Sequence, residues 1–152
     1  TRSFVVGADD AAWITVNNRA FAQHPEQGGW TTEVLRSRQS EKWFDPNGFL
    51  LHHIKTNATD QLAGFCWTKI DKDTDPSVGE IYVIAVDPQF HGQGLGRALT
   101  VAGLNHLAKA NATTGMLFVD RDNDAAVTTY TKLGFTIHDI EQAFVGEIPS
   151  HI

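Results

Sequence analysis

The spacing of hydrophobic residues changes several times along the chain and predicts alternating strands and helices. A short apolar run, SFVV, is followed by residues 8–23, in which apolar positions recur at helical spacing. A break that contains Pro25, Gly28 and Gly29 separates this helix from a second one, predicted over 31–44. The N-terminal third is therefore expected to hold one short strand and two helices joined by a loop.

The middle of the chain contains three continuous apolar runs, at 48–54, 61–70 and 79–87, with short polar connections between them. Consecutive strands joined in this way favour an antiparallel meander. The pattern beyond them predicts a helix over 96–110, a strand over 115–120, a helix over 123–133 ended by Gly134, and an extended segment over 135–148. Residues 1–152 are thus expected to form a single α+β domain with a mixed sheet.

Composition narrows the classes of partner. The 152 residues, 41% of them hydrophobic, suffice for one folded domain. The net charge of −6 and the lack of a basic run argue against nucleic acid as a partner. No apolar stretch approaches the roughly 20 residues that span a membrane, and no signal peptide is visible, so a cytoplasmic protein is expected. Because the sequence begins with Thr1, we expect a piece of a longer chain.

Three glycines stand at every second position in VDPQFHGQGLGRALT, and we call residues 87–96 the glycine loop. A loop of this kind that opens a helix aims free N–H groups at an anion. A Walker-type phosphate loop is excluded because Arg97 follows Gly96 where that motif has lysine. A dinucleotide fingerprint is disfavoured because Arg97 replaces its third glycine, although Asp120 lies where a ribose-binding acid is expected. A purely structural turn is the remaining alternative.

Other polar residues give no sign of a metal site. The seven histidines show no ligand spacing, and the adjacent His52 and His53 are expected on opposite faces of a strand. The single cysteine, Cys66, lies in an apolar run, which favours a buried structural thiol and a reducing compartment. The tryptophans are expected to pack in or around the core, with Trp30 a possible exception because it follows the loop that contains Glu26.

Two motifs together resemble the GNAT superfamily of acyl-CoA-dependent N-acetyltransferases. The first is GEIYVIAVDPQFHGQGLGRAL, and the second is DNDAAVTTYTKLGF, about one strand and one helix later. The resemblance implies a three-layer fold with about four helices, antiparallel strands 2 to 4, and a strand pair 4/5 that splays apart. It also implies acetyl-CoA as cosubstrate.

The resemblance assigns the coenzyme-binding residues to three groups. The strand before the glycine loop exposes backbone N–H groups, the loop itself binds the pyrophosphate, and the second motif supplies further contacts. His91 departs from the arginine or glutamine that the family has at this position, and most donors of such a loop are expected to come from the main chain. The residues implied are Ile84, Ala85, Val86, His91, Gly92, Gln93, Gly94, Leu95, Gly96, Arg97, Asn123, Ala126 and Val127.

Two residues suit the chemistry of acetyl transfer, which needs a neutral amine and a protonated leaving thiolate. Glu80 opens an apolar strand, where partial burial raises the pKa of a carboxylate toward that of a useful base. A solvated acid at a strand end is its plain alternative. Tyr130 shares a helix face with Ala126 and Leu133 and, taken alone, reads as a core tyrosine. By resemblance, Glu80 is the base and Tyr130 the general acid.

A narrower resemblance, to the C-terminal half of the mycothiol synthase family, rests on NNRAFAQHPEQGGWT, EKWFDPNG, GFCWTKI and GEIYVIAVDP. That family carries two GNAT domains in tandem, and its C-terminal domain acetylates a cysteinyl-glucosaminyl-inositol. The resemblance implies substrate contacts from Glu26, Lys69 and Glu80; a loop acid and a snorkelling lysine are the plain alternatives for the first two. Phe118 stands where the family has a substrate-contacting tyrosine. Another amine acceptor, or a non-catalytic acyl-CoA-binding domain, remains open.

Overall fold

The computed structural model describes residues 1–24 and 26–141. They divide into two compact units, Thr1–Asp120 and a second that begins at Arg121. The first unit contains β1 (Arg2–Ser3), α1 (Asp10–Ala20), α2 (Thr32–Gln39), β2 (Phe49–Lys55), β3 (Asp60–Lys69), β4 (Val78–Val86), α3 (Leu95–Lys109) and β5 (Thr114–Leu117). Two 3-10 turns, Pro46–Gly48 and Pro88–Phe90, precede β2 and α3, and the second unit contains α4 (Asp124–Lys132).

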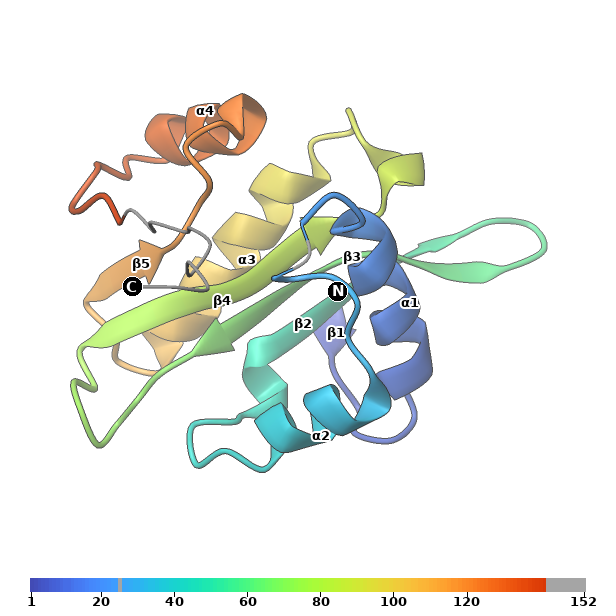
Figure 1. The fold of residues 1–152 in the computed structure, drawn as a ribbon, viewed down its shortest axis with the longest axis horizontal. Helices are drawn as coiled ribbons and strands as arrows, with labels where there is room; N and C mark the ends of the chain where they lie inside the picture. The colour runs from blue at the N-terminus through green and yellow to red at the C-terminus, as the bar shows by residue number, and fades with distance from the viewer. Residues whose placement is uncertain (25, 142–152) are drawn as a thin grey trace, which may run out of the picture. The chain divides into compact units, whose positions relative to one another are not determined.

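The five strands of the first unit form one sheet in the order β1-β2-β3-β4-β5 (Figure 1). The first three pairings are antiparallel, and β4 pairs with β5 in parallel. The parallel pairing follows from chain connectivity, because α3 carries the chain back across the sheet between these two strands. The predicted meander, the mixed sheet and the α+β class are confirmed.

Each face of this sheet buries its own hydrophobic cluster. On one face α1 and α2 cover a large aromatic cluster, in which Trp13 and Trp67 are fully buried. On the other face α3 packs Leu99 and Leu107 against Cys66 and Ile81. The alternation of side chains along β3 explains the split, since Trp67 and Cys66 are neighbours that point in opposite directions. The first unit therefore has three layers, with the sheet in the middle (Figure 1).

Strand β4 contains a β-bulge at Tyr82. Trp67 of β3 pairs with Val83, and the next residue, Thr68, pairs with Ile81, so Tyr82 is an extra residue on β4. As a result Tyr82 and Val83 both lie on the face covered by α1 and α2. The bulge shifts the β3/β4 register by one residue, so that on the side before it Glu80 pairs with Lys69.

Strands β4 and β5 pair over only part of their length. The register runs from Val78 opposite Thr114 to Ile81 opposite Leu117. Within the described residues, β4 continues to Val86 with no β5 partner for residues 82–86. The expected splayed pair is confirmed, and it leaves the edge of β4 open to another hydrogen-bonding group.

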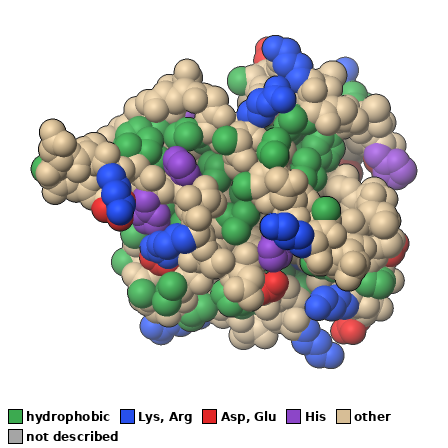
Figure 2. Space-filling model, turned by 180° about the vertical axis from the view of Figure 1, so that it is seen from behind, with side chains coloured by type: hydrophobic (Ala, Val, Ile, Leu, Met, Phe, Trp, Pro, Cys, Tyr) green, Lys and Arg blue, Asp and Glu red, His purple; other side chains and the backbone are tan. Residues whose placement is uncertain are grey.

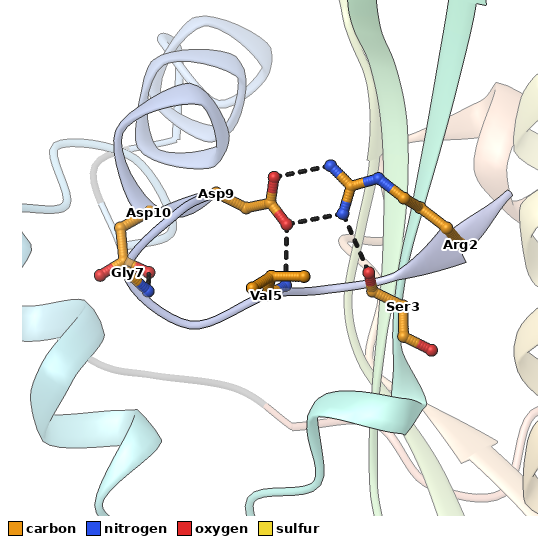
Figure 3. Close-up of polar contacts among 6 residues, drawn as sticks. All are labelled: Arg2, Ser3, Val5, Gly7, Asp9 and Asp10. Atoms are coloured by element: carbon orange, nitrogen blue, oxygen red, sulfur yellow. Dashed lines mark hydrogen bonds and ion pairs between the residues drawn. The ribbon is translucent and has the colours of Figure 1, made fainter.

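The N-terminal segment is held to the start of α1 by a carboxylate. Asp9 accepts two hydrogen bonds from the Arg2 guanidinium, both at 2.7 Å, and a third from the backbone N–H of Val5 at 2.7 Å (Figure 3). These bonds lower the pKa of Asp9, with the Arg2 contact as the largest cause. Asp10 accepts from the N–H of Gly7, whose φ of +83° a residue with a side chain rarely adopts.

Some predicted boundaries were wrong. The second helix ends at Gln39 rather than at residue 44, because Ser40 caps it and the chain then turns so that Trp43 and Phe44 pack against Trp67. The first strand is only Arg2–Ser3. Of the predicted extended segment over 135–148, the described residues 135–141 form no strand, and the rest lies outside the described residues. None of the described helices is long and apolar enough to cross a membrane.

Candidate functional site

The glycine loop leads from β4 into α3 with its backbone exposed. Gly92 and Gly94 have φ values of +80° and +77°, and Gly94 is the N-cap of α3 without any side-chain cap. A Cβ placed on Gly92, Gly94 or Gly96 would meet nothing within 4 Å. The N–H groups of the first turn of α3 therefore face open space, and these backbone donors suit an anion such as a pyrophosphate.

Asp87, which the sequence analysis did not single out, anchors the beginning of this loop. Its side chain is 2% exposed, and its carboxylate lies 2.6 Å from the Arg19 guanidinium of α1. The same carboxylate accepts a hydrogen bond from the N–H of Gln89, and the N–H of Asp87 donates to the carbonyl of Ala63. Buried, paired and doubly hydrogen-bonded, Asp87 fixes the start of the loop to α1 and β3.

His91 closes the base of the loop. One of its ring nitrogens, Nε2, lies 3.0 Å from the backbone carbonyl oxygen of Val86. Since a carbonyl only accepts, Nε2 carries the hydrogen in this contact. The side chain is thus turned back toward the end of β4. This geometry favours the backbone N–H groups, rather than the imidazole, as the donors of the loop. The side chains of Gln93 in the loop and of Arg97, directly after it, are exposed.

Ile84, Ala85 and Val86 lie on the part of β4 that has no β5 partner among the described residues. All three are paired with β3 on the other side. In a β-strand successive backbone N–H groups point alternately to the two edges, so this stretch offers donors to a ligand that lies along the open edge. Their predicted role in holding an acyl-CoA is compatible with this placement.

Glu80 and Lys69 face each other across β4 and β3. They are directly opposed in the antiparallel register, which brings the two side chains to the same face of the sheet. Glu80 is half-buried, and this burial raises the pKa of its carboxyl group, while the nearby Lys69 charge acts in the lowering direction. The Glu80 environment is therefore the kind that produces a base, and it differs from that of a solvated strand-end acid.

Two aromatic residues that the sequence analysis did not assign to the site surround Lys69. Its ammonium lies 4.8 Å from the centre of the Trp43 ring and 5.7 Å from that of Tyr82. Tyr82 was visible in the sequence as the residue two positions after Glu80 and so on the same strand face. Trp43 left no such signal, because it comes from the turn after α2.

Glu26 and Phe118 each lie two residues from a member of one side-chain contact, that between His24 and Asp120. Both residues are exposed, Phe118 at 61%. In that contact, Nδ1 of His24 lies 3.1 Å from a carboxylate oxygen of Asp120. The structure thus pairs Asp120 with a histidine. Among the described residues, Glu26 forms no ion pair with Lys69.

The second unit carries the other motif on α4. The side-chain oxygen of Asn123 accepts a hydrogen bond from the N–H of Ala126 at 3.2 Å and so caps the helix. At the other end Gly134 has a φ of +94°, and the N–H of Phe135 donates to the carbonyl of Tyr130. The ring of Tyr130 packs 5.8 Å from that of Phe135, and Tyr130 and Val127 are partly exposed. The motif thus defines both ends of α4.

Two further sets of side chains bear on the expectations about metals and nucleic acids, namely the metal-ligating types and the basic ones. No group of three or more His, Cys, Asp or Glu side chains in the described part of the chain is placed to hold a metal ion. The Lys and Arg side chains on the face drawn in Figure 2 lie in several separate places. The expectations of a metal-free site and of no nucleic-acid partner remain predictions.

Three features together indicate the class of protein. They are the β4/β5 pair that splays apart, the glycine loop at the N-terminus of α3, and the two sequence motifs. The profile of the acetyltransferase (GNAT) family matches residues 13–135, and the chain belongs to this family. A solved relative is the ribosomal-protein-S18-alanine N-acetyltransferase of Escherichia coli, with a TM-score of 0.66 and 30% identity over 90% of this chain and 77% of that one.

Two curated proteins called mycothiol acetyltransferase are more similar in sequence. The one from Nocardia farcinica is 48% identical over 143 residues, which cover 94% of this chain and 47% of that protein. The one from Kocuria rhizophila is 51% identical over 136 residues, covering 88% and 45%. The chain therefore spans about half the length of the curated relatives it matches.

Proposed function

We propose that this chain transfers an acetyl group from acetyl-CoA to a primary amine, namely the cysteinyl amine of cysteinyl-glucosaminyl-inositol, which gives mycothiol. The observation that carries the proposal is the half-buried Glu80 beside Lys69, on the strand whose next residues lose their β5 partner. The choice of acceptor is supported by relatives of about 50% identity that are called mycothiol acetyltransferase.

Acetyl-CoA fits the two backbone features at the end of β4. Its pyrophosphate is doubly negative and matches the uncapped first turn of α3, where the glycines leave room for close approach. The pantetheine arm carries amide groups that can pair with the open edge of β4 at residues 82–86, as an added strand would. A backbone donor in this edge would polarise the thioester carbonyl.

In the proposed reaction the amine attacks the carbonyl carbon of the thioester. A C–N bond forms, the C–S bond breaks, and coenzyme A leaves as a thiolate. Glu80 accepts a proton from the amine, directly or through one water molecule, which makes the nitrogen lone pair available. The raised pKa of Glu80 brings its basicity closer to that required near neutral pH. The departing thiolate takes up a proton.

Tyr130 is the proposed donor of that proton, by resemblance to the family. Replacing Tyr130 with Phe removes the hydroxyl and keeps the ring that packs on Phe135. We expect turnover to fall about 100-fold, in the range of general acid catalysis, with the dissociation constant of acetyl-CoA unchanged. Steady-state kinetics and calorimetric titration of acetyl-CoA measure the two effects. Full turnover in the Phe variant would remove Tyr130 from this role.

The acceptor is proposed to contact Glu26, Lys69 and Glu80, with Phe118 packing against one of its rings. A hydroxyl-rich sugar and inositol require such charged hydrogen-bonding groups, and Phe118 offers an exposed apolar surface. The other half of the relatives' length is proposed to be a preceding second GNAT domain that completes the acceptor cleft. We also place the reaction in the cytoplasm, where a free cysteine such as Cys66 is stable.

The test is an acetyl-transfer assay with acetyl-CoA and cysteinyl-glucosaminyl-inositol. The product should be followed by mass spectrometry as the gain of one acetyl group, since both the acceptor and coenzyme A are thiols. Parallel reactions use glucosaminyl-inositol without the cysteinyl group, a peptide with an N-terminal alanine, and the Glu80→Gln variant. Both the 152-residue chain and a longer chain with a preceding domain should be assayed.

Acetylation of the cysteinyl compound alone, lost in Glu80→Gln, is the expected result. Acetylation of the peptide would instead make the chain a protein N-terminal acetyltransferase. Tight acetyl-CoA binding with no product from any acceptor, in either form of the protein, would contradict catalysis and leave an acyl-CoA-binding domain.

A further inference from the structure

The Lys69 side chain is held in place by two aromatic rings. Its Nζ atom lies 4.8 Å from the centre of the Trp43 ring and 5.7 Å from that of Tyr82, both within the range of a cation–π contact. A lysine on a strand otherwise has a flexible four-carbon stem and turns its charge toward solvent. Here the rings favour one position of the ammonium over the sheet.

The two rings are themselves fixed on the core. Trp43 packs 5.0 Å from Tyr82 and 5.9 Å from Trp67, and Tyr82 packs 5.2 Å from Trp67, measured between ring centres. Trp67 is fully buried. The bulge of β4 contributes because it keeps Tyr82 on the same face as Val83 and Trp67. The position of Lys69 is therefore set by the interior of the protein.

Glu80 is the group that this charge faces. It stands directly opposite Lys69 in the β3/β4 register, yet the two side chains form no ion pair within 4 Å in the described part of the chain. Lys69 therefore acts on Glu80 through space. Since Glu80 is half-buried, a charge at this separation is screened less than on an open surface.

Among the described residues, Lys69 is the charge that acts on the pKa of Glu80, and Asp71, two residues after Lys69, is a second carboxylate that the Lys69 charge acts on. On β4 the ionisable neighbour is Tyr82, and the β5 residues paired with this part of β4, 114–117, carry no ionisable side chain. In the segment after α2, Lys42 is 93% exposed and lies 3.9 Å from Asp73, and Glu41 is exposed. Asp45 lies 3.6 Å from His106 of α3.

We propose that Trp43 and Tyr82 are positioning residues, whose rings hold the Lys69 ammonium on the sheet face that it shares with Glu80 and so favour the ionised form of the Glu80 carboxylate. The catalytic meaning rests on the proposed role of Glu80 as the base. Burial disfavours the ionised form of a carboxylate, and only the ionised form of Glu80 can accept a proton from an amine. The fixed ammonium opposes burial without an ion pair that would occupy the carboxylate oxygens.

The direct test is the titration of Glu80 by NMR of carboxyl ¹³C-labelled Glu in the whole 152-residue chain, with its signal assigned from Glu80→Gln. In Lys69→Met we expect the midpoint to rise by about one pH unit. Trp43→Leu and Tyr82→Leu should raise it in the same direction. Trp43→Phe, Tyr82→Phe and Lys69→Arg should stay near the wild type because they keep the ring or the charge.

Lys42→Met is the matched control, because it removes a nearby lysine that is 93% exposed, whereas the cation–π contacts with the two rings come from Lys69. Its midpoint should equal that of the wild type. An unchanged midpoint in Lys69→Met would overturn the proposal, as would a shift in Lys69→Met with none in both Trp43→Leu and Tyr82→Leu. Each variant should be checked for folding by thermal unfolding, and where one of the two Leu variants is unstable the other one decides.

The pH dependence of kcat/KM, measured on the same variants, distinguishes this proposal from the proposed function. If Glu80 is the base, the acidic limb of kcat/KM for the amine moves with the NMR midpoint in every variant. NMR shifts with a stationary acidic limb would refute Glu80 as the base and leave the positioning intact. A change in KM for the amine in Lys69→Met, with no shift of either midpoint, would make Lys69 a substrate contact only and refute the positioning.

Discussion

The glycine loop and the surface around Glu80 lie at opposite ends of β4, and they are built by different means. In the loop the useful groups are backbone N–H groups, made accessible by Gly92, Gly94 and Gly96. Around Glu80 the useful groups are side chains from three separate segments: Lys69 on β3, Tyr82 on β4, and Trp43 after α2. One strand thus carries a site made of main chain and a site made of side chains.

This difference fits the two ligands that we propose. Coenzyme A presents the same pyrophosphate in every acyl transfer, and a helix N-terminus recognises it without any particular side chain. The amine differs from one acceptor to another, so its recognition requires side chains that can change. A substitution around Glu80 should therefore change the reaction or the acceptor, whereas a substitution in the loop should change affinity for acetyl-CoA.

The largest expected effect comes from the side-chain end. Glu80→Gln should lower kcat/KM for the amine by about 100-fold or more at neutral pH, with the affinity for acetyl-CoA unchanged. The loss should shrink as pH rises, because the amine then loses its proton without help. The pH profile of initial rates measures this. A defect that is constant with pH would instead indicate a substrate contact.

At the backbone end, Gly96→Ala should weaken acetyl-CoA binding by about tenfold or more, because the added methyl group lies where the ligand approaches. The free protein should be as stable as wild type, since Gly96 has no positive φ and a Cβ there meets nothing within 4 Å. Calorimetric titration and thermal unfolding measure the two quantities. Unchanged affinity would show that the ligand does not approach this glycine.

Gly7→Ala is the control with the opposite pattern. Gly7 has a φ of +83° and an open surrounding, but it lies before α1 and outside the glycine loop. Alanine in this conformation should cost about 1 kcal/mol of stability. Acetyl-CoA affinity should not change. The two glycine variants together separate backbone strain from ligand contact.

A smaller effect is expected from His91→Ala. The contact that this change removes, between Nε2 and the carbonyl of Val86, is exposed, and Asp87 still anchors the loop. We expect acetyl-CoA affinity to fall only about twofold to fivefold. A loss of about 100-fold would mean that the imidazole itself binds the pyrophosphate, and the loop would then no longer be a site made of main chain.

The smallest effect on either end of β4 should come from Asp9→Asn, which acts on stability alone. The pKa of Asp9 is lowered in the folded state, so its stabilisation is complete above the ordinary aspartate pKa of about 4 and is lost as pH falls through the folded-state value. At pH 7 the variant should lose roughly 1 to 2 kcal/mol, allowing for the half-exposed Arg2. Urea unfolding should show this difference shrinking in acid. A constant difference would contradict the linkage.

The sequence predicted the main-chain site better than the side-chain site. Backbone positions with positive φ favour glycine, so the glycine loop and the C-terminal end of α4 could be predicted from the glycines in the sequence. Strands β2, β3 and β4 could also be predicted, because each is a continuous apolar run. The contact of Trp43 with Lys69 was not, since it depends on how the turn after α2 folds onto β3. The pairs Arg19–Asp87 and His24–Asp120 were missed for the same reason.

The burial of Cys66 has a consequence for a protein that handles thiols. In the proposed reaction, coenzyme A and the cysteinyl acceptor both carry a sulfhydryl group, and thiol–disulfide exchange begins with a thiolate. Cys66, the only cysteine of the chain, is fully enclosed between β3 and α3, and burial raises the pKa of its thiol to about 12. These 152 residues therefore offer no accessible thiol for a mixed disulfide with the proposed substrates.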